Sequence, residues 1–151
     1  MNSKQLDKTD LRILQELKQN CRRSYRELAL STKLSPATLI ERIKRMEKEG
    51  VITGYSANFD YLQLGFEFMA IVQISMSGDL LSIQDKISKL KGVASIYDTT
   101  GQYDATAILM CKSRGELSAL VKRILAISGV EKTNTNMVLN VVKKLTDFAQ
   151  I

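Results

Sequence analysis

The sequence contains no histidine and no tryptophan among its 151 residues, and only one proline and two cysteines. Without histidine the chain lacks the most common general base near neutral pH, the usual partner of a nucleophilic serine or cysteine, and imidazole metal ligands. It also has neither a P-loop nor a GxGxxG sequence. The composition gives no support to an enzyme, and we expect no catalytic residue, no metal site and no cofactor.

The two cysteines, Cys21 and Cys111, lie far apart in the sequence and have no metal-ligand spacing. We interpret both as reduced, mostly buried thiols. No apolar run approaches the roughly 20 residues that span a bilayer, and residues 1–5 lack the apolar stretch of a signal peptide. We therefore expect a cytoplasmic protein without a membrane partner.

Positive charge is concentrated at the start of the chain. Residues 1–50 hold twelve Lys and Arg against seven Asp and Glu, a net of +5, whereas the whole chain carries +6. Such an asymmetry favours a first part that binds a polyanion, joined to a second part with another task.

The basic region ends in the pattern of two short helices joined by a tight turn. Ser24 and Glu27 fit a capping box at the start of the first helix. Ser35 and Pro36 fit the N-cap and first residue of the second, which Gly50 ends. A preceding helix is predicted over residues 8–20, capped by Asp7 and with its core side formed by Leu11, Leu14 and Leu17.

The last of these helices has two different faces at 100° per residue. One side carries Leu39, Ile40, Ile43 and Met46, and the other carries short polar and cationic residues. A helix that lies in the DNA major groove needs this combination, although an ordinary amphipathic hairpin with solvated charges would also show it. The predicted DNA-binding residues are Arg22, Arg23, Arg26, Ser35, Pro36, Ala37, Thr38, Glu41, Arg42 and Arg45.

After residue 50 the pattern changes. A β-rich stretch over residues 51–59 predicts a wing strand and then a connector. The elements that follow are predicted as strand 66–75, helix 80–90, strands 93–100 and 105–111, helix 116–127 and strand 130–142. Their order, βαββαβ, is the ferredoxin-like arrangement. We predict an α+β protein with a winged helix-turn-helix domain over 1–52, a connecting segment over 53–65 and a ferredoxin-like domain over 66–151.

In the predicted ferredoxin-like domain both helices pack on one face of the sheet, so the other face needs another cover. The alternating apolar residues Phe68, Ala70, Val72 and Ile74 favour a second subunit's sheet as that cover, and therefore a homodimer.

Polar residues gather between the two middle strands. Thr99 and Thr100 precede Gly101, and Tyr103 and Asp104 follow it closely. These residues have two interpretations, a β-turn stabilised by its own polar groups or a polar ligand pocket with one carboxylate for an ammonium group.

The motifs together resemble the leucine-responsive regulatory protein/AsnC family, also called feast/famine regulators. The resemblance lies in Ser35-Pro36-Ala37-Thr38, Arg42-Ile43, Glu47 and Gly50-Val51-Ile52, and later in Thr100-Gly101-x-Tyr103-Asp104 and Thr133-x-Thr135. Lys33 departs from the family pattern, which often has glycine in this turn. The resemblance implies that a small molecule, usually an amino acid, binds between subunits. The effector-binding residues are then Thr99, Thr100, Gly101, Tyr103, Asp104, Thr133 and Thr135.

This resemblance implies a transcription regulator that binds double-stranded DNA as a homodimer or as an octamer of four dimers. Siroheme decarboxylase subunits are similar in overall pattern and have lost DNA binding, so an enzyme subunit is one alternative. An amino-acid sensor without a DNA role is another. The absence of histidine and the cationic helix face count against the enzyme.

Overall fold

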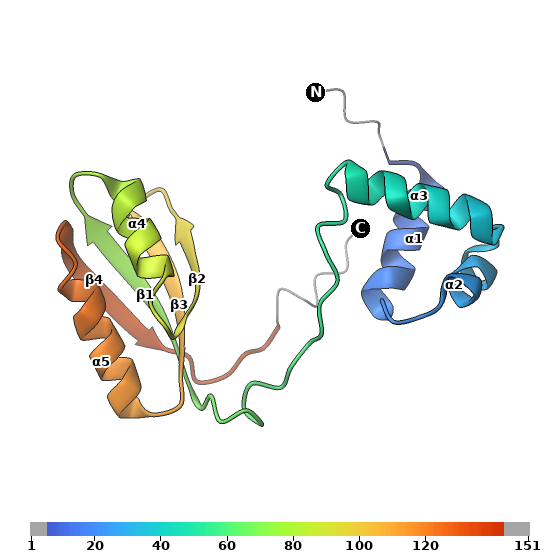
Figure 1. Cartoon of the computed structure of the whole chain (residues 1–151). Coiled ribbons are helices and arrows are strands. Elements are labelled where there is room, and N and C mark those ends of the chain that lie inside the picture. Colours follow the sequence, from blue (N-terminus) through green and yellow to red (C-terminus); the bar gives the residue numbers. More distant parts are fainter. Residues whose placement is uncertain (1–5, 144–151) are drawn as a thin grey trace. The chain divides into compact units, whose positions relative to one another are not determined.

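The structure is a computed structural model of the chain and describes residues 6–143. It contains two compact units, of which the first ends at Asn58 and the second begins at Phe59. The first unit is helical and the second combines a sheet with helices (Figure 1). The boundary between the units falls inside the connecting segment expected over 53–65.

Three helices form the first unit, namely α1 (Lys8–Gln19), α2 (Tyr25–Thr32) and α3 (Pro36–Lys48). Each begins at its predicted N-cap, because the side chains of Asp7, Ser24 and Ser35 accept hydrogen bonds from backbone N–H groups three residues later. The capping box of Ser24 and Glu27 is present, and α1 has a second one formed by Asp7 and Asp10. The start of every helix is thus encoded locally.

The turn between α2 and α3 is built on Lys33. Its backbone is left-handed, with φ 58° and ψ 40°, and it is the only residue other than glycine with positive φ between residues 6 and 143. A side chain costs roughly 1 kcal/mol in this conformation. The structure confirms that lysine occupies a position that glycine suits better.

A small apolar core holds the three helices together. Ile13, Leu28, Leu39, Ile43 and Met46 are at most 1% exposed. The prediction for α1 was right for Leu17 and wrong for Leu11, which is only half-buried. The buried side of α1 runs through Asp10, Ile13 and Leu17, because these residues are spaced by about one helical turn.

The predicted wing strand is not formed. Residues 51–58 follow α3 as a bend and then irregular chain, and no strand lies between residue 6 and residue 58. A strand needs a neighbour to accept and donate its backbone hydrogen bonds, and the described residues of the helical unit, 6–58, provide none. Ile52 instead packs against the apolar core.

The second unit is a four-stranded antiparallel sheet with two helices. Its elements are β1 (Phe68–Met76), α4 (Leu80–Ser88), β2 (Val93–Asp98), β3 (Ala105–Cys111), α5 (Arg114–Leu125) and β4 (Val130–Met137), and the strand order is β2-β3-β1-β4. The predicted βαββαβ order is confirmed. The last strand is five residues shorter than predicted at its end, since its regular pairing with β1 ends at Ala70 and Met137 and only Val138 donates one further hydrogen bond, to Met69.

Both helices lie on the same face of the sheet (Figure 1). Ala70, Val72 and Ile74 are 0% exposed and share one core cluster with residues of α4 and α5. Our assignment of these residues, together with Phe68, to the face that a second subunit covers was therefore wrong. Strand alternation places Met69 and Ile71 of β1 on the open face, beside their β3 partners Met110 and Ile108.

Each helix of this unit is followed by the same tight turn. Val93 donates its N–H to the carbonyl of Leu90 at 3.1 Å, and Val130 donates to Ile127 at 3.0 Å. The glycine before each valine has positive φ, 99° at Gly92 and 93° at Gly129. A β-carbon on Gly129 would lie 2.8 Å from the carbonyl oxygen of Ser77, so this position excludes larger residues by space as well as by backbone conformation.

Candidate nucleic-acid interface and effector site

The outer side of α3 presents several of the predicted DNA-binding residues to solvent. Ser35, Pro36, Ala37, Thr38 and Glu41 are all exposed. Lys44 and Lys48 continue this exposed stripe along the helix, and Lys44 was not among the predicted contacts. An open hollow of about 760 Å³, here called the α3 hollow, is lined by Asp7, Thr38, Glu41, Arg42, Lys44, Arg45, Lys48 and Glu49.

Arg42 and Arg45 are occupied by contacts within the protein. Arg42 Nη1 donates to Asp7 Oδ2 at 2.7 Å and to Asp10 Oδ1 at 2.8 Å. Arg45 Nη2 donates to Asp10 Oδ2 at 2.6 Å. The helix face expected to reach base edges through Arg45 therefore holds that guanidinium against α1.

Asp10 is the buried centre of this network. Its side chain is 1% exposed, and its Oδ2 also accepts the backbone N–H of Asp7 at 3.1 Å. Burial favours the neutral carboxyl, but the hydrogen bonds from Arg45, Asp7 and Arg42 outweigh it and lower the pKa of Asp10 below its ordinary value. Hydrogen bonding to Arg42 likewise lowers the pKa of Asp7. Both carboxylates are ionised at neutral pH.

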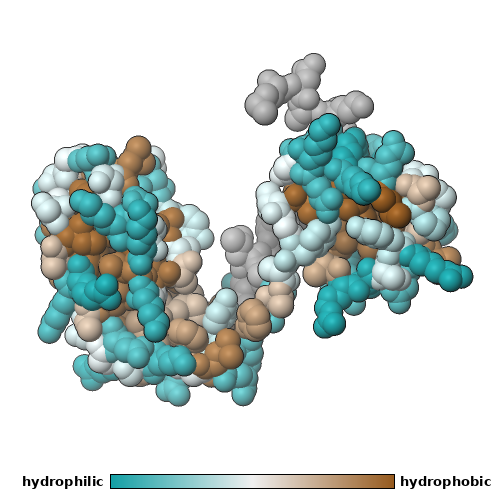
Figure 2. Space-filling view, viewed as in Figure 1, coloured by the Kyte–Doolittle hydropathy of each residue, from teal (hydrophilic) through white to brown (hydrophobic). Residues whose placement is uncertain are grey.

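The arginines before and within α2 differ in how freely their side chains could contact DNA phosphates. Arg22 and Arg26 are exposed, as phosphate contacts require. Arg23 is half-buried, pairs with Glu16 of α1 and donates to the carbonyl of Glu27 at 3.4 Å. Hydrophilic residues project from much of the visible surface of this unit (Figure 2).

The chain after α3 is fastened back onto that helix. The hydroxyl of Tyr55 donates to Glu47 Oε1 at 2.8 Å. Partial burial and this carboxylate raise the pKa of Tyr55 to about 12. Tyr55 thereby links the irregular segment after α3 to that helix without forming a wing strand.

The second unit has a polar hollow of about 440 Å³, here called the sheet hollow. It lies on the open face of the sheet and brings together three predicted effector residues, Thr99, Thr100 and Tyr103. Gln73 and Asn134 are directly paired across β1 and β4, and Asn134 Nδ2 donates to Gln73 Oε1 at 3.1 Å. The residues of this hollow that sequence analysis missed are Gln73, Gln102, Thr106 and Asn134.

The remaining predicted effector residues do not line this hollow. Thr133 and Thr135 pair with Ile74 and Val72, so strand alternation places them on the helix-covered face. Asp104 Oδ2 accepts the backbone N–H of Met76 at 2.7 Å, and its own N–H donates to Ile74 at 3.0 Å. Gly101 has φ 117°, and a β-carbon there would meet no atom within 4 Å. The β-turn interpretation of residues 99–104 therefore agrees in part with the structure, because Asp104 uses its polar groups to bond the turn to β1.

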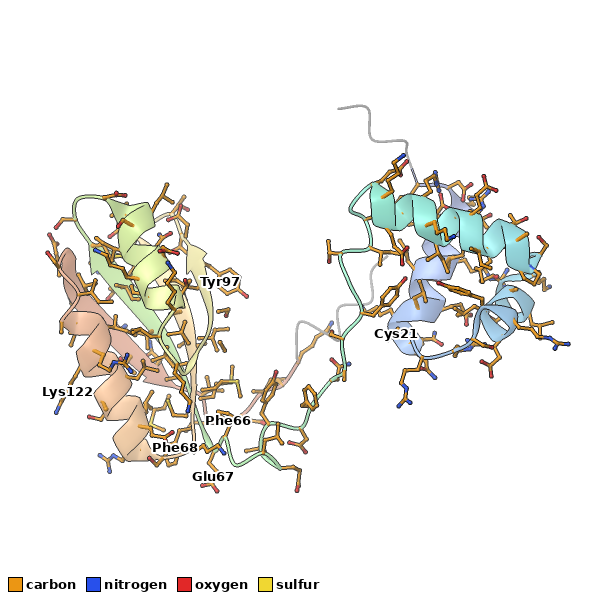
Figure 3. All side chains as sticks on the ribbon, viewed as in Figure 1. Cys21, Phe66, Glu67, Phe68, Tyr97 and Lys122 are labelled. Atoms are coloured by element: carbon orange, nitrogen blue, oxygen red, sulfur yellow. The ribbon has the colours of Figure 1, made fainter. Side chains whose placement is uncertain are left out.

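Tyr97 extends the open face towards β2. It pairs with Thr106 of β3, and its side chain is 49% exposed. Figure 3 shows this side chain projecting from β2 away from α4. Within residues 6–143 no helix is long and apolar enough to cross a membrane, and that range contains no group of acidic or cysteine side chains arranged to hold a metal ion.

Comparison with known proteins identifies both units. Residues 6–53 match a family profile described as winged helix-turn-helix DNA-binding, and residues 69–148 match the Lrp/AsnC ligand binding domain. The chain is 40% identical to an uncharacterized HTH-type transcriptional regulator of Pyrococcus abyssi, over 92% of this chain and 95% of the relative.

Two solved structures share the whole architecture. E. coli AsnC has a TM-score of 0.85 and 31% identity, with 94% of this chain and 99% of AsnC covered. The transcriptional regulator NMB0573 of Neisseria meningitidis, solved in complex with L-Met, has a TM-score of 0.87 and 27% identity, with 93% and 94% covered.

The fold and the matches define the class, a transcriptional regulator with a helix-turn-helix DNA-binding domain and a ligand-binding domain. The chain belongs to the Lrp/AsnC family. Membership agrees with the resemblance drawn from the sequence motifs.

Proposed function

We propose that the protein is a sequence-specific DNA-binding regulator of transcription that responds to an amino acid bound between subunits. One observation carries the DNA part, namely that α3 is a capped helix with a buried apolar side and an exposed stripe of short polar and cationic residues. We also propose that the protein acts in the cytoplasm.

The proposed DNA contacts divide into two groups. Ser35, Pro36, Ala37, Thr38 and Glu41 form the exposed start of α3 and are assigned to the major groove. Arg22 and Arg26 are assigned to phosphates, which set affinity but not sequence preference. Arg23, already paired with Glu16, is assigned a supporting phosphate contact.

Selection of binding sites from a random pool of duplex DNA tests this proposal. The full chain should enrich one pseudo-palindromic sequence and bind it more tightly than a scrambled duplex of the same composition. Thr38→Ala should reduce that preference by roughly 1–3 kcal/mol. Failure to enrich any sequence at moderate salt would contradict the proposal.

Two observations support an amino acid as effector. The sheet hollow is lined by hydroxyl and amide side chains that can donate to a carboxylate or accept from an ammonium group. The related regulator NMB0573 was solved in complex with L-Met. Asp104 has a second carboxylate oxygen besides the one that accepts the Met76 N–H. Thr133 and Thr135 lie on the other face of the sheet from the hollow, so their proposed effector contacts would belong to a separate subunit boundary.

A thermal-shift screen of the twenty amino acids tests the effector. An amino acid that binds the folded protein should raise its melting temperature in a concentration-dependent way. Calorimetry should then show weaker binding in Gln73→Ala and Thr106→Ala, which line the hollow, than in the control Leu81→Ala on the outer side of α4. No shift with any amino acid would contradict this part of the proposal.

A homodimer formed through the open face of the sheet is the proposed assembly. The central part of this face is apolar through Met69, Ile71, Ile108 and Met110, although none of the helices described between residues 6 and 143 covers it. A twofold dimer would present two copies of α3 to a pseudo-palindromic site, and an octamer of four dimers is the proposed larger assembly.

Light scattering on charge variants tests the assembly. Ile71→Glu should convert the protein to monomers, because it would bury a carboxylate at the centre of the apolar face. Leu81→Glu is the matched control, since Leu81 lies on α4 and is 75% exposed. Unchanged molar mass in Ile71→Glu would exclude the open face as the interface.

A further inference from the structure

The carboxylate of Asp10 connects α1 to α3 at two points. Arg42 and Arg45 reach it from positions separated by about one turn of α3, and each guanidinium contacts a different carboxylate oxygen. Two contacts at separate points along a helix fix both its rotation and its position along the axis. The apolar core alone constrains these less strictly, because side chains such as Ile43 and Met46 can repack.

Stability alone does not explain a buried charge at this position. Removing the carboxylate of Asp10 from water costs free energy that its pairing with two partly exposed guanidinium groups only offsets, and apolar residues of similar size often stabilise a fold as well. The geometric requirement of the guanidinium is stricter than that of an apolar contact, since its N–H groups leave a rigid plane. The network is therefore better suited to fixing an orientation than to adding stability.

We infer that Asp10 is a positioning residue for sequence recognition, and that Arg42 and Arg45 hold α3 in register with α1 instead of reading bases. The exposed stripe of Thr38, Glu41, Lys44 and Lys48 then faces the DNA in a fixed orientation. This inference rests on the proposed DNA-binding function. It assigns recognition to residues whose side chains are free of the buried network.

A positioning role for Asp10 and a purely electrostatic role predict opposite changes in DNA affinity when its charge is removed. Asp10 lies beside the surface that would face phosphates, so loss of its negative charge should strengthen binding to any duplex. Loss of a positioning contact should instead weaken binding to the preferred duplex only. The ratio of the affinities for selected and scrambled duplexes therefore reports positioning, and overall affinity does not.

The test compares Asp10→Asn with the full wild-type chain on both duplexes across a salt series. The ratio should fall about tenfold, as is typical of coupling through a packed network. Binding to the scrambled duplex should stay the same or rise, and the salt slope should not decrease. Asp10→Glu, which restores a carboxylate, should recover part of the ratio.

Asp7→Asn is the matched control. It also removes one negative charge that contacts Arg42, but Asp7 is 52% exposed and asparagine remains a good N-cap. The ratio should change less than about twofold in this variant, within the range of surface ion pairs. Arg42→Lys provides a second test, because it keeps the charge but loses the planar guanidinium whose Nη1 contacts both Asp7 and Asp10. Its ratio should fall, with binding to the scrambled duplex unchanged.

An unchanged ratio in folded Asp10→Asn, or in Arg42→Lys if Asp10→Asn does not fold, would overturn the inference. Equal affinity of the wild-type protein for both duplexes would be a different result, since it would contradict the proposed DNA-binding function before any variant is compared.

Discussion

The two units of this protein are stabilised in different ways. Within residues 6–58, the helical unit has a small apolar core of seven buried residues beside a network of arginines and carboxylates. The sheet unit has thirteen buried residues in its core cluster, and the ion pair of Lys89 with Asp85 lies at its surface. The unit proposed to meet DNA thus depends on charges that pH can change, whereas the unit proposed to bind the effector depends on close packing.

The comparison predicts that a packing defect will affect the sheet unit most. Gly129→Ala places a β-carbon against Ile83 and the carbonyl of Ser77 at a positive φ, and should destabilise that unit by about 2–4 kcal/mol. Gly101→Ala is the control, because it has open space and should cost only about 1–2 kcal/mol of backbone strain. Hydrogen exchange followed by mass spectrometry should show faster exchange in β1 with α3 unchanged. Equal effects at both glycines would contradict the packing account.

Acid should weaken the helical unit first. The pKa of Asp10 is lowered in the folded protein, so its contacts stabilise the fold at neutral pH and are lost as pH falls below about 4 and through the folded-state pKa. Asp10→Asn should cost about 1–3 kcal/mol at pH 7 and remove most of this acid dependence. Hydrogen exchange of α3 peptides between pH 7 and pH 3, corrected for intrinsic rates, measures both. An acid dependence of α3 that is identical in the variant would show that other groups cause it.

Removal of phosphate contacts should change salt dependence and leave the fold intact. Arg22→Ala and Arg26→Ala each should reduce the slope of log affinity against log salt by about 0.9, the value for one phosphate contact on duplex DNA. Both side chains are exposed, so neither unit should lose stability. Lys122→Ala, on α5 of the sheet unit, should leave the slope unchanged. Equal reductions in all three variants would indicate an effect of net charge alone.

The smallest predicted effect concerns the contact of Tyr55 with Glu47. Because partial burial and Glu47 raise the pKa of Tyr55 to about 12, this contact stabilises the folded state below pH 10 and is lost as pH rises through 12. Absorbance titration of the tyrosines should show a late component that disappears in Tyr55→Phe and persists in Tyr97→Phe. If the late component persisted in Tyr55→Phe, it would belong to another tyrosine and the prediction for Tyr55 would be wrong.

Features determined by neighbouring residues could be predicted from the sequence. The caps at Asp7, Ser24 and Ser35 and the strand and helix order depend on contacts within a few residues, and the structure confirms them. The environment of Asp10 could not be predicted, because its partners Arg42 and Arg45 are 32 and 35 residues away. A polar residue at the spacing of Ile13 and Leu17 was the one available signal.

The wrong assignment of residues to the two faces of the sheet arose because both faces of β1 carry apolar side chains. Both sets of alternating residues in β1 contain apolar side chains, Ala70 and Val72 in one and Met69 and Ile71 in the other. A period of two separates these sets but does not say which one the helices cover. The same ambiguity hid Asn134, which lies on the face opposite to the flanking Thr133 and shares the sheet hollow with Gln73.

The central claim is that the protein binds a specific DNA sequence and responds to an amino acid. The most direct test measures the affinity of the full chain for its selected duplex and for a scrambled duplex. Each affinity is measured with and without the amino acid found by thermal shift. The account predicts that the selected duplex binds at least about tenfold tighter and that the amino acid changes this affinity or the assembly that binds. Equal affinity for both duplexes, with no response to the amino acid, would contradict it.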